Sequence, residues 1–263
     1  MECSSLIASN LSSCQGMAWS TMTTNKGMFD LYSDDIHVWV IDLTSSAIKW
    51  DDYSVLLSRD ELFRAQRYKF RDDRNNFITR RGILRLLLSF YINVEPSLIQ
   101  FEYRSLGKPF IIPLDHHQSI RFNLSHTREL AAIAITQFKE VGIDIEKCNS
   151  QIDYRQISER FFTENERIKL LSCREDKRIK MFTRIWTRKE AFVKALGLGM
   201  SMPLENIDIL RSPGQKQLNC NRELWHGYHE STTLRDLSFP HDHLGAVAIC
   251  GNMHDIRIEE WRD

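Results

Sequence analysis

The segment WTRKEAFVKALG, Trp186 to Gly197, decides how the second half of this chain folds. Its apolar residues recur at helical spacing, and the arc that should face a core consists of Phe192, Val193 and Leu196. Glu190 and Lys194 lie one turn apart on one face, with Glu190 beside Trp186 at the margin of that arc. A pair at this spacing is usually a surface device, worth about 0.3 kcal/mol. A functional role for Glu190 would be favoured if a group of charged residues elsewhere in the chain could form a site together with it.

Such a group occurs in VGIDIEK, Val141 to Lys147. Strand alternation places the three apolar residues on one face and Gly142, Asp144 and Glu146 on the other. Two neighbouring carboxylates repel each other and need a counter-charge, which a divalent cation such as Mg²⁺ supplies through oxygen ligands. The alternative is a solvated strand face. Glu190 as a third ligand favours the metal site and would leave Lys194 facing the anion that the metal holds.

The whole-chain composition limits the class of protein. The chain has 263 residues, 42% of them hydrophobic, and its 35 Lys and Arg residues balance 35 Asp and Glu residues. Zero net charge argues against a general nucleic-acid binder, so we expect no nucleic-acid partner. Six cysteines without a C-x-x-C pair favour free thiols. Without a membrane-length apolar run or a secretory signal, we expect a cytoplasmic protein with no membrane contact.

The chain is predicted to have two similar halves. Residues 1–34 are rich in Ser, Thr, Asn and Met without a clear period, which predicts a possibly mobile N-terminal extension. Residues 35–138 form the predicted N-terminal half and residues 139–263 the C-terminal half. Duplicated halves of this kind create a cleft between them, which is a common place for ligands.

Each half is predicted to contain a strand, a short helix and a longer helix, in that order. In the first half these are His37–Leu43, a helix that Ser58 caps, and a helix over about 74–91. In the second half they are Val141–Lys147, a helix opened by a Thr163–Glu166 capping box, and the helix that ends in the quoted stretch. Further strands are expected at Phe101–Tyr103, Phe110–Ile112, Ile120–Leu124, Leu130–Thr136 and Leu244–Cys250.

Three other features suit anion binding. Between Arg59 and Arg85 nine cations face four acids; most are expected on a solvated helix face, and one or two are candidates for phosphate binding. The turn Leu106 to Pro109 holds a lysine at a stiff corner. Phe122 to Thr127 ends a strand in polar donors suited to phosphate oxygens. A Ser/His hydrolase centred on Ser125 is disfavoured, because no G-x-S-x-G surrounds it.

Four segments then occur in the order of a known family's signature blocks: LGKP (106–109), FNLSH (122–126), VGIDIE (141–146) and WTRKEAFVKALG (186–197). On these blocks the chain resembles the Sfp-type 4′-phosphopantetheinyl transferases, over about residues 37–250. The resemblance implies an α+β fold whose two similar α/β halves are related by a pseudo-two-fold axis, with the active-site cleft between them, in a monomer. It also implies transfer of phosphopantetheine from coenzyme A to a serine of an apo acyl or peptidyl carrier protein, with release of adenosine 3′,5′-bisphosphate.

The resemblance also implies roles for single residues. Asp144, Glu146 and Glu190 would bind Mg²⁺, and Glu190 would take the serine proton or orient the group that takes it. Lys194 would contact the phosphate under attack or the leaving diphosphate. The implied contacts to coenzyme A are Leu106, Gly107, Lys108 and Pro109 at the adenine and ribose-phosphate end, Asn123, Ser125 and His126 near phosphates, and Arg64 or Arg81 at the 3′-phosphate.

Two other functions remain as alternatives. One is another Mg²⁺-dependent nucleotide transferase or hydrolase that uses the same three acids, which its product would distinguish. The other is a non-catalytic relative that binds carrier proteins, against which the complete acid set argues.

Overall fold

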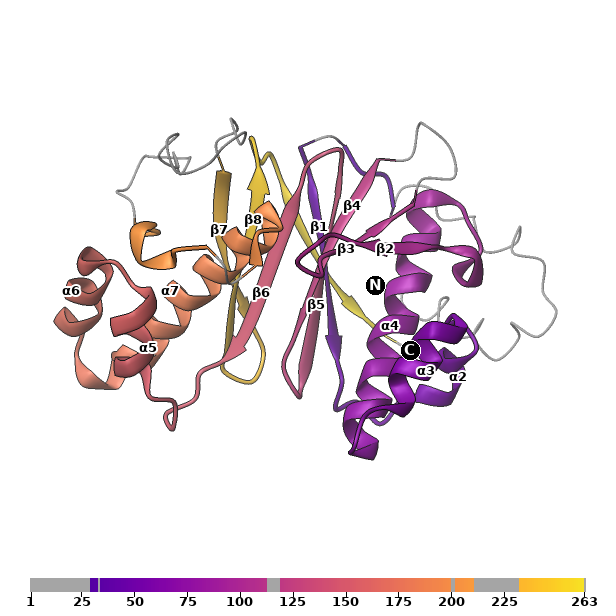
Figure 1. Cartoon of the computed structure of the whole chain (residues 1–263), viewed down its shortest axis with the longest axis horizontal. Coiled ribbons are helices and arrows are strands. Elements are labelled where there is room, and N and C mark those ends of the chain that lie inside the picture. The colour runs from indigo at the N-terminus through magenta and orange to yellow at the C-terminus, as the bar shows by residue number, and fades with distance from the viewer. Residues whose placement is uncertain (1–28, 33, 113–118, 200–201, 211–231, 263) are drawn as a thin grey trace.

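The computed structural model describes residues 29–32, 34–112, 119–199, 202–210 and 232–262, and shows a mixed α/β protein of four layers. Two sheets lie face to face in the middle, and one group of helices covers the outer face of each sheet (Figure 1). In the described part of the chain, no helix is both long and apolar enough to cross a membrane.

The first half supplies one sheet and its helices. Its elements are β1 (Ile36–Asp42), α2 (Trp50–Ser54), α3 (Arg59–Gln66), α4 (Arg71–Ile92), a 3₁₀ turn (Pro96–Leu98), β2 (Phe101–Tyr103), β3 (Pro109–Ile111), β4 (Ile120–His126) and β5 (Leu130–Gln137). At the start of α3 the Ser58 amide donates to the Glu61 carboxylate at 3.0 Å. At the end of α4, Asn93 adopts the left-handed conformation that commonly terminates helices.

The second half repeats this plan. Its elements are β6 (Val141–Lys147), α5 (Tyr154–Phe161), α6 (Glu164–Ser172), α7 (Glu175–Leu196), a 3₁₀ turn (Leu204–Asn206), β7 (Thr232–Phe239), β8 (His243–Cys250) and β9 (Ile256–Trp261). The predicted Thr163–Glu166 capping box opens α6, and Gly197 ends α7 with φ of 70°. The predicted strands and long helices are therefore confirmed, whereas α2, α5, β7 and β9 were not predicted.

The two sheets share one pairing scheme. The first has the strand order β4-β5-β1-β9 and the second β6-β8-β7. In the first half, β1 pairs antiparallel with β5, the second strand of the β4–β5 hairpin, with Val38 opposite Ala134. In the second half, β6 pairs antiparallel with β8, the second strand of the β7–β8 hairpin, with Ile143 opposite Val247. The order β4-β5-β1 thus corresponds to β7-β8-β6.

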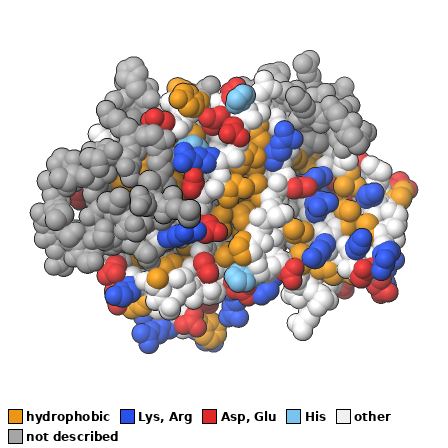
Figure 2. Space-filling model, turned by 180° about the vertical axis from the view of Figure 1, so that it is seen from behind, with side chains coloured by type: hydrophobic (Ala, Val, Ile, Leu, Met, Phe, Trp, Pro, Cys, Tyr) orange, Lys and Arg blue, Asp and Glu red, His pale blue; other side chains and the backbone are white. Residues whose placement is uncertain are grey.

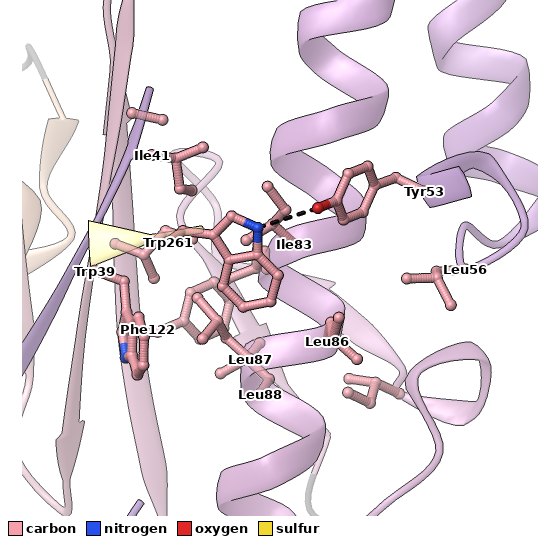
Figure 3. Close-up of a cluster of buried hydrophobic side chains, with 14 of the residues drawn as sticks. Trp39, Ile41, Tyr53, Leu56, Ile83, Leu86, Leu87, Leu88, Phe122 and Trp261 are labelled. Atoms are coloured by element: carbon pink, nitrogen blue, oxygen red, sulfur yellow. Dashed lines mark hydrogen bonds between the residues drawn. The ribbon is translucent and has the colours of Figure 1, made fainter. Parts of the chain in front are cut away.

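The predicted boundary 139–263 is wrong at its end, because β9 returns to the first sheet. There it pairs parallel with β1, with Val38 opposite Ile258. Trp261 packs among the helices of the first half, and its indole N–H donates to the Tyr53 hydroxyl at 3.1 Å (Figure 3). The sequence signal was weak because three of the six residues of β9 are charged and the alternation is broken at Glu259 and Glu260.

Between the sheets lies a continuous apolar layer. Its side chains come from both central strands and their partners: Ile36, Val38, Val40, Leu130, Ala132, Ala134, Val141, Ile143, Ile145, Leu237, Phe239, Val247 and Ile249. The alternation predicted for β6 is confirmed, since its three apolar residues all belong to this layer. Asp144 and Glu146 consequently point the other way.

The two sheets also meet at their edges, where β4 lies against β6. The Ile143 amide donates to the Asn123 side-chain oxygen at 2.9 Å, and the Ile145 amide donates to the Ser125 hydroxyl at 3.4 Å. At this edge of β6, side chains of β4 accept the backbone hydrogen bonds that a neighbouring strand would otherwise accept. This arrangement fixes β4 beside the carboxylates of β6.

The predicted N-terminal extension lies mostly outside the described residues, which omit 1–28 and 33. Its last part is packed rather than free. Phe29 stacks on Phe90 with ring centroids 4.7 Å apart, and Leu31 packs against the core of the first half. Folding of the first half therefore includes at least residues 29–32.

A buried ion pair joins α6 to α7 next to the predicted metal ligand Glu190. Lys189 and Glu166 are both fully buried, with Nζ and Oε2 2.8 Å apart. Lys189 also donates to the carbonyls of Leu204 and Ile207, at 2.7 and 2.6 Å. Glu166 accepts from the amides of Thr163 and Ile209, both at 2.8 Å. Every polar group of this network has a partner, which is the condition for tolerating buried charges.

We predict that Lys189→Met destabilises the protein by about 3–5 kcal/mol, because it leaves the Glu166 charge buried without its partner. Urea denaturation followed by circular dichroism measures this change. Lys177→Met, on an exposed turn of the same helix, should stay within about 0.5 kcal/mol of the wild type. Equal stability of the two variants would contradict the prediction.

His37 on β1 belongs to a buried hydrogen-bond chain that requires a neutral imidazole. The Trp39 indole donates to the Tyr91 hydroxyl at 2.9 Å, so this hydroxyl donates its own proton to His37 Nδ1, 2.7 Å away. Burial, reinforced by Arg257, lowers the pKa of His37. Because the folded state binds this proton less readily than the unfolded state, the contribution to stability is complete above pH 6.5 and is lost as pH falls below it.

We therefore predict that His37→Gln reduces the loss of unfolding free energy between pH 7.5 and pH 5.5. Urea midpoints at the two pH values test this prediction. His254→Gln is the control, because the His254 side chain is 83% exposed and should leave the pH dependence unchanged. An unchanged pH dependence in His37→Gln would show that this histidine is not the titrating group.

Candidate active site

A pocket lies where β4, β6 and α7 meet, and we call it the carboxylate pocket. It is lined by Leu124, Ser125, His126, Asp144, Glu146, Trp186, Glu190 and Lys194. The pocket thus brings together Asp144 and Glu146, on a strand, and Glu190, on a helix more than forty residues later in the chain. Trp186, Glu190 and Lys194 lie at successive turns of α7, which explains why Glu190 is at the margin of the apolar arc.

Gly142 allows α7 to lie directly on β6. A Cβ at this position would overlap the Ala191 carbonyl oxygen and the Ala195 amide nitrogen. Both are backbone atoms of α7, so no flexible side chain could move aside. The absence of a side chain at Gly142 therefore sets the distance between the strand and the helix that carry the acids.

Lys194 is the cation of the carboxylate pocket. Its Nζ lies 2.6 Å from Asp144 Oδ1 and donates to the Ser125 hydroxyl at 3.1 Å. Ser125 in turn donates to Asp144 Oδ1 at 2.9 Å. Ser125 is therefore held in place by three partners, counting the Ile145 amide described above. None of these contacts is to a histidine, so they do not support a Ser/His hydrolase centred on Ser125.

The carboxylates nevertheless have too few partners. Asp144 Oδ2 and Glu190 Oε1 are buried and have no hydrogen-bond partner. Burial raises the pKa of Glu146 to about 7, with Asp144 adding to the shift, and burial also raises the pKa of Glu190. These carboxylates repel one another and have oxygens without partners. A hard divalent cation would bind such oxygens and offset the repulsion.

The described residues contain no group of three His, Cys, Asp or Glu side chains already arranged around a metal position. In this structure Lys194 supplies the positive charge at Asp144 instead. The donor set itself, three carboxylates on adjoining elements, remains of the type that binds Mg²⁺.

A second pocket adjoins the first, and we call it the arginine pocket. Its lining residues are Arg64, Tyr68, Phe77, Arg80, Arg81, Leu84, Tyr103, Gly107, Pro109, Asn123, Leu124 and His126. Leu124 and His126 line both pockets, so the two are continuous along the end of β4. Among the residues that the structure describes, three arginines and no carboxylate line the arginine pocket.

The two arginines predicted to contact the 3′-phosphate differ in their surroundings. Arg81 pairs with the buried Glu61 and stacks over Phe101, 4.0 Å from the ring centroid. Arg64 lies over the Phe77 ring, 5.4 Å from its centroid. Both line the arginine pocket, and Glu61 already balances the charge of Arg81.

The Lys108 side chain does not line either pocket. It is only 8% exposed, and its Nζ lies 2.7 Å from Glu140 and donates to the carbonyls of Val141 and Ala195, at 2.9 and 3.1 Å. Lys108 thus ties the β2–β3 turn to the C-terminal end of α7. The sequence did not show these three partners, and the predicted place of Lys108 at the adenine and ribose-phosphate end of coenzyme A stays a prediction.

The other three residues of the predicted turn, and Asn123 on β4, lie in different places. Gly107 and Pro109 line the arginine pocket. Leu106 is 51% exposed and lies beside Gly199 rather than in a pocket. Asn123 lines the arginine pocket, but its side-chain oxygen is engaged by the Ile143 amide.

Sequence reasoning missed several lining residues. Arg80 was considered only as one of the nine cations of the basic segment, and Trp186 only as the neighbour of Glu190 at the margin of the apolar arc. A usable signal existed in α4, where Phe77, Arg80, Arg81 and Leu84 recur at i, i+3, i+4 and i+7 and all line the arginine pocket. A mixed face of arginine and apolar residues is typical of a pocket wall rather than of a solvated helix.

Comparisons with known proteins define the class. Residues 140–248 match the model of the 4′-phosphopantetheinyl transferase superfamily, and residues 44–138 match that of a 4′-phosphopantetheinyl transferase N-terminal region. The chain is 35% identical over 221 residues to the 4′-phosphopantetheinyl transferase HetI of Nostoc, covering 84% of this chain and 90% of the relative. It is 30% identical over 161 residues to the 4′-phosphopantetheinyl transferase Sfp of Bacillus subtilis, covering 60% and 69% respectively.

These matches span both halves and both pockets. The chain belongs to the 4′-phosphopantetheinyl transferase superfamily, as its four sequence blocks predicted.

We predict that Glu146→Gln and Glu190→Gln each weaken Mg²⁺ binding by about tenfold or more, because each removes a charged oxygen ligand. Calorimetric titration of Mg²⁺ in the presence of coenzyme A measures this effect. Glu164→Gln, which changes an exposed glutamate on α6, should bind Mg²⁺ like the wild type. Undiminished binding by Glu190→Gln would exclude it as a ligand.

Proposed function

We propose that this chain transfers the 4′-phosphopantetheine arm of coenzyme A to a serine of an apo acyl or peptidyl carrier protein. The second product is adenosine 3′,5′-bisphosphate, and the reaction depends on Mg²⁺. The observation that supports this most strongly is the pair of adjoining pockets, one with carboxylates and a lysine, the other with arginines. Coenzyme A carries a diphosphate and a separate 3′-phosphate, and so needs two neighbouring sites for anions.

Asp144, Glu146 and Glu190 are the residues that would hold Mg²⁺. A divalent ion in this position would offset the charge that develops on the diphosphate oxygens. The buried oxygens of Asp144 and Glu190 that lack partners support this assignment.

The remaining chemistry belongs to side chains of the chain. The carrier serine oxygen forms a bond to the phosphorus of the phosphopantetheine arm, and the bond from that phosphorus to the oxygen of the adenosine bisphosphate breaks. Lys194 neutralises charge on the diphosphate, and Ser125 orients the Lys194 ammonium. Glu190 takes the serine proton or orients the group that takes it.

The repeated pairing scheme supports a pseudo-two-fold relation between the halves, with the cleft formed where β4 meets β6. The first half then supplies the 3′-phosphate end and the second half the metal end. Because one chain contributes both walls, we propose that it acts as a monomer. The free thiols of Cys148 and Cys173 support a reducing cytoplasm as its location.

The surface of the second half suits an acidic protein partner. Figure 2 shows Lys and Arg side chains spread over this half, interleaved with apolar and acidic ones. On α6, Ile168 and Leu171 are 61% and 57% exposed, and the exposed Lys169 lies between them. Carrier proteins are acidic around their serine, so local positive charge would accelerate encounter even without net charge.

We predict that the chain, mixed with coenzyme A, Mg²⁺ and an apo carrier protein, adds one phosphopantetheine arm to one serine. Mass spectrometry should show the heavier carrier, with an equal amount of adenosine 3′,5′-bisphosphate. EDTA should stop the reaction, excess Mg²⁺ should restore it, and added salt should slow it by screening the surface charges.

A carrier with serine replaced by alanine must remain unmodified. Consumption of coenzyme A without carrier modification would identify a hydrolase instead. Binding of carriers with no modification of any of them would identify a non-catalytic relative.

A further inference from the structure

Arg80 on α4 is a buried cation with no anionic partner in the described part of the chain. The residue is 8% exposed and makes no hydrogen bond or ion pair there. The arginines that follow it differ: Arg81 pairs with Glu61, and Arg85 pairs with Glu61 at 2.6 Å and donates to two backbone carbonyls. One carboxylate thus serves Arg81 and Arg85, and none serves Arg80.

A buried guanidinium without a counter-charge is unfavourable. Burial lowers the pKa of Arg80 to about 10, and only Tyr68 and Asp73 act in the opposite direction. The side chain therefore remains charged at neutral pH and lacks the pairing that normally stabilises such a group. An arginine kept in this state is suited to an anion that arrives from outside.

The anion has room next to Arg80. The side chain lines the arginine pocket together with Arg64 and His126, and none of the described residues that line this pocket is a carboxylate. We propose that Arg80, rather than Arg81, is the residue that binds the 3′-phosphate of coenzyme A and so selects coenzyme A over its dephospho form. This inference rests on the proposed function and specifies one group of the substrate and one residue.

The choice between the two anionic groups of coenzyme A follows from the charges. In the carboxylate pocket, Lys194 and a divalent ion held by Asp144, Glu146 and Glu190 would offset the charge of the diphosphate. A phosphomonoester is close to doubly charged at pH 7 and needs cations without competing acids. The arginine pocket offers this environment, and Arg81 is expected to contribute less than Arg80 because its guanidinium is already paired with Glu61.

The test compares Arg80→Met with Arg81→Met and with Arg71→Met, an exposed control on the same helix. Calorimetry measures binding of coenzyme A and of dephospho-coenzyme A. Loss of a charge-assisted hydrogen bond should weaken binding of coenzyme A to Arg80→Met about ten- to a hundredfold and leave dephospho-coenzyme A within about threefold. Arg81→Met should show a smaller difference between its losses of affinity for the two ligands, and Arg71→Met should bind both ligands like the wild type.

A second readout separates binding from a structural role. Because Arg80 is unpaired, Arg80→Met should melt at the wild-type temperature or higher without ligand, and coenzyme A should raise its melting temperature less than that of the wild type. A structural arginine would instead lower the melting temperature and leave affinity unchanged. Arg80→Lys, which keeps the charge, should retain part of the preference for coenzyme A and can be tested if the methionine variant does not fold.

Two results would overturn the inference: equal losses for both ligands, or unchanged binding of coenzyme A by Arg80→Met. The wild type reports separately on the proposed function. If it modifies a carrier while Arg80→Met binds both ligands normally, only the role of Arg80 is wrong. If the wild type binds coenzyme A but modifies no carrier, the proposed function is wrong. The calorimetric comparison of the two ligands then still tests the contact between Arg80 and the 3′-phosphate.

Discussion

The direct contact between β6 and α7 at Gly142 is the constraint on which the rest of the site depends. Any side chain there would overlap the backbone of α7 and push the helix away from the strand. With the glycine in place, Glu190 and Lys194 on the helix line the same pocket as Asp144 and Glu146 on the strand. The apolar layer behind β6 then fixes which face of the strand carries the acids.

A second constraint joins the two halves. Asn123 and Ser125 of β4 accept hydrogen bonds from backbone amides at the edge of β6. Lys108 connects the β2–β3 turn to Glu140 and to the end of α7. Arg104 and Arg121 also pair with Glu140. These contacts place the arginine pocket of the first half against the carboxylate pocket of the second. The order of charges along the two pockets, acidic at one end and basic at the other, follows from this junction.

The sequence predicted those parts of the fold and the site that local periodicity controls. Alternation in VGIDIEK identified the acids, and the i,i+4 pair in WTRKEAFVKALG identified Glu190 and Lys194. The capping box at Thr163 located α6. Periodicity could not show what depends on contacts distant in the chain. The return of β9 to the first sheet depends on pairing with β1, and the orientation of Lys108 depends on Glu140 and Ala195. The pairing of Arg81 and Arg85 with Glu61 on α3, which Arg80 does not share, is likewise a contact that periodicity does not show.

The central claim is that acids from a strand and a helix form one metal site beside Lys194. Anomalous diffraction from a crystal of the protein with Mn²⁺ and coenzyme A tests it most directly. The account predicts an anomalous peak within coordination distance of oxygens of Asp144, Glu146 and Glu190, with the Lys194 ammonium moved from Asp144 to a phosphate oxygen. A Mn²⁺ peak away from these three carboxylates, with the Lys194–Asp144 pair intact and coenzyme A bound, would contradict it.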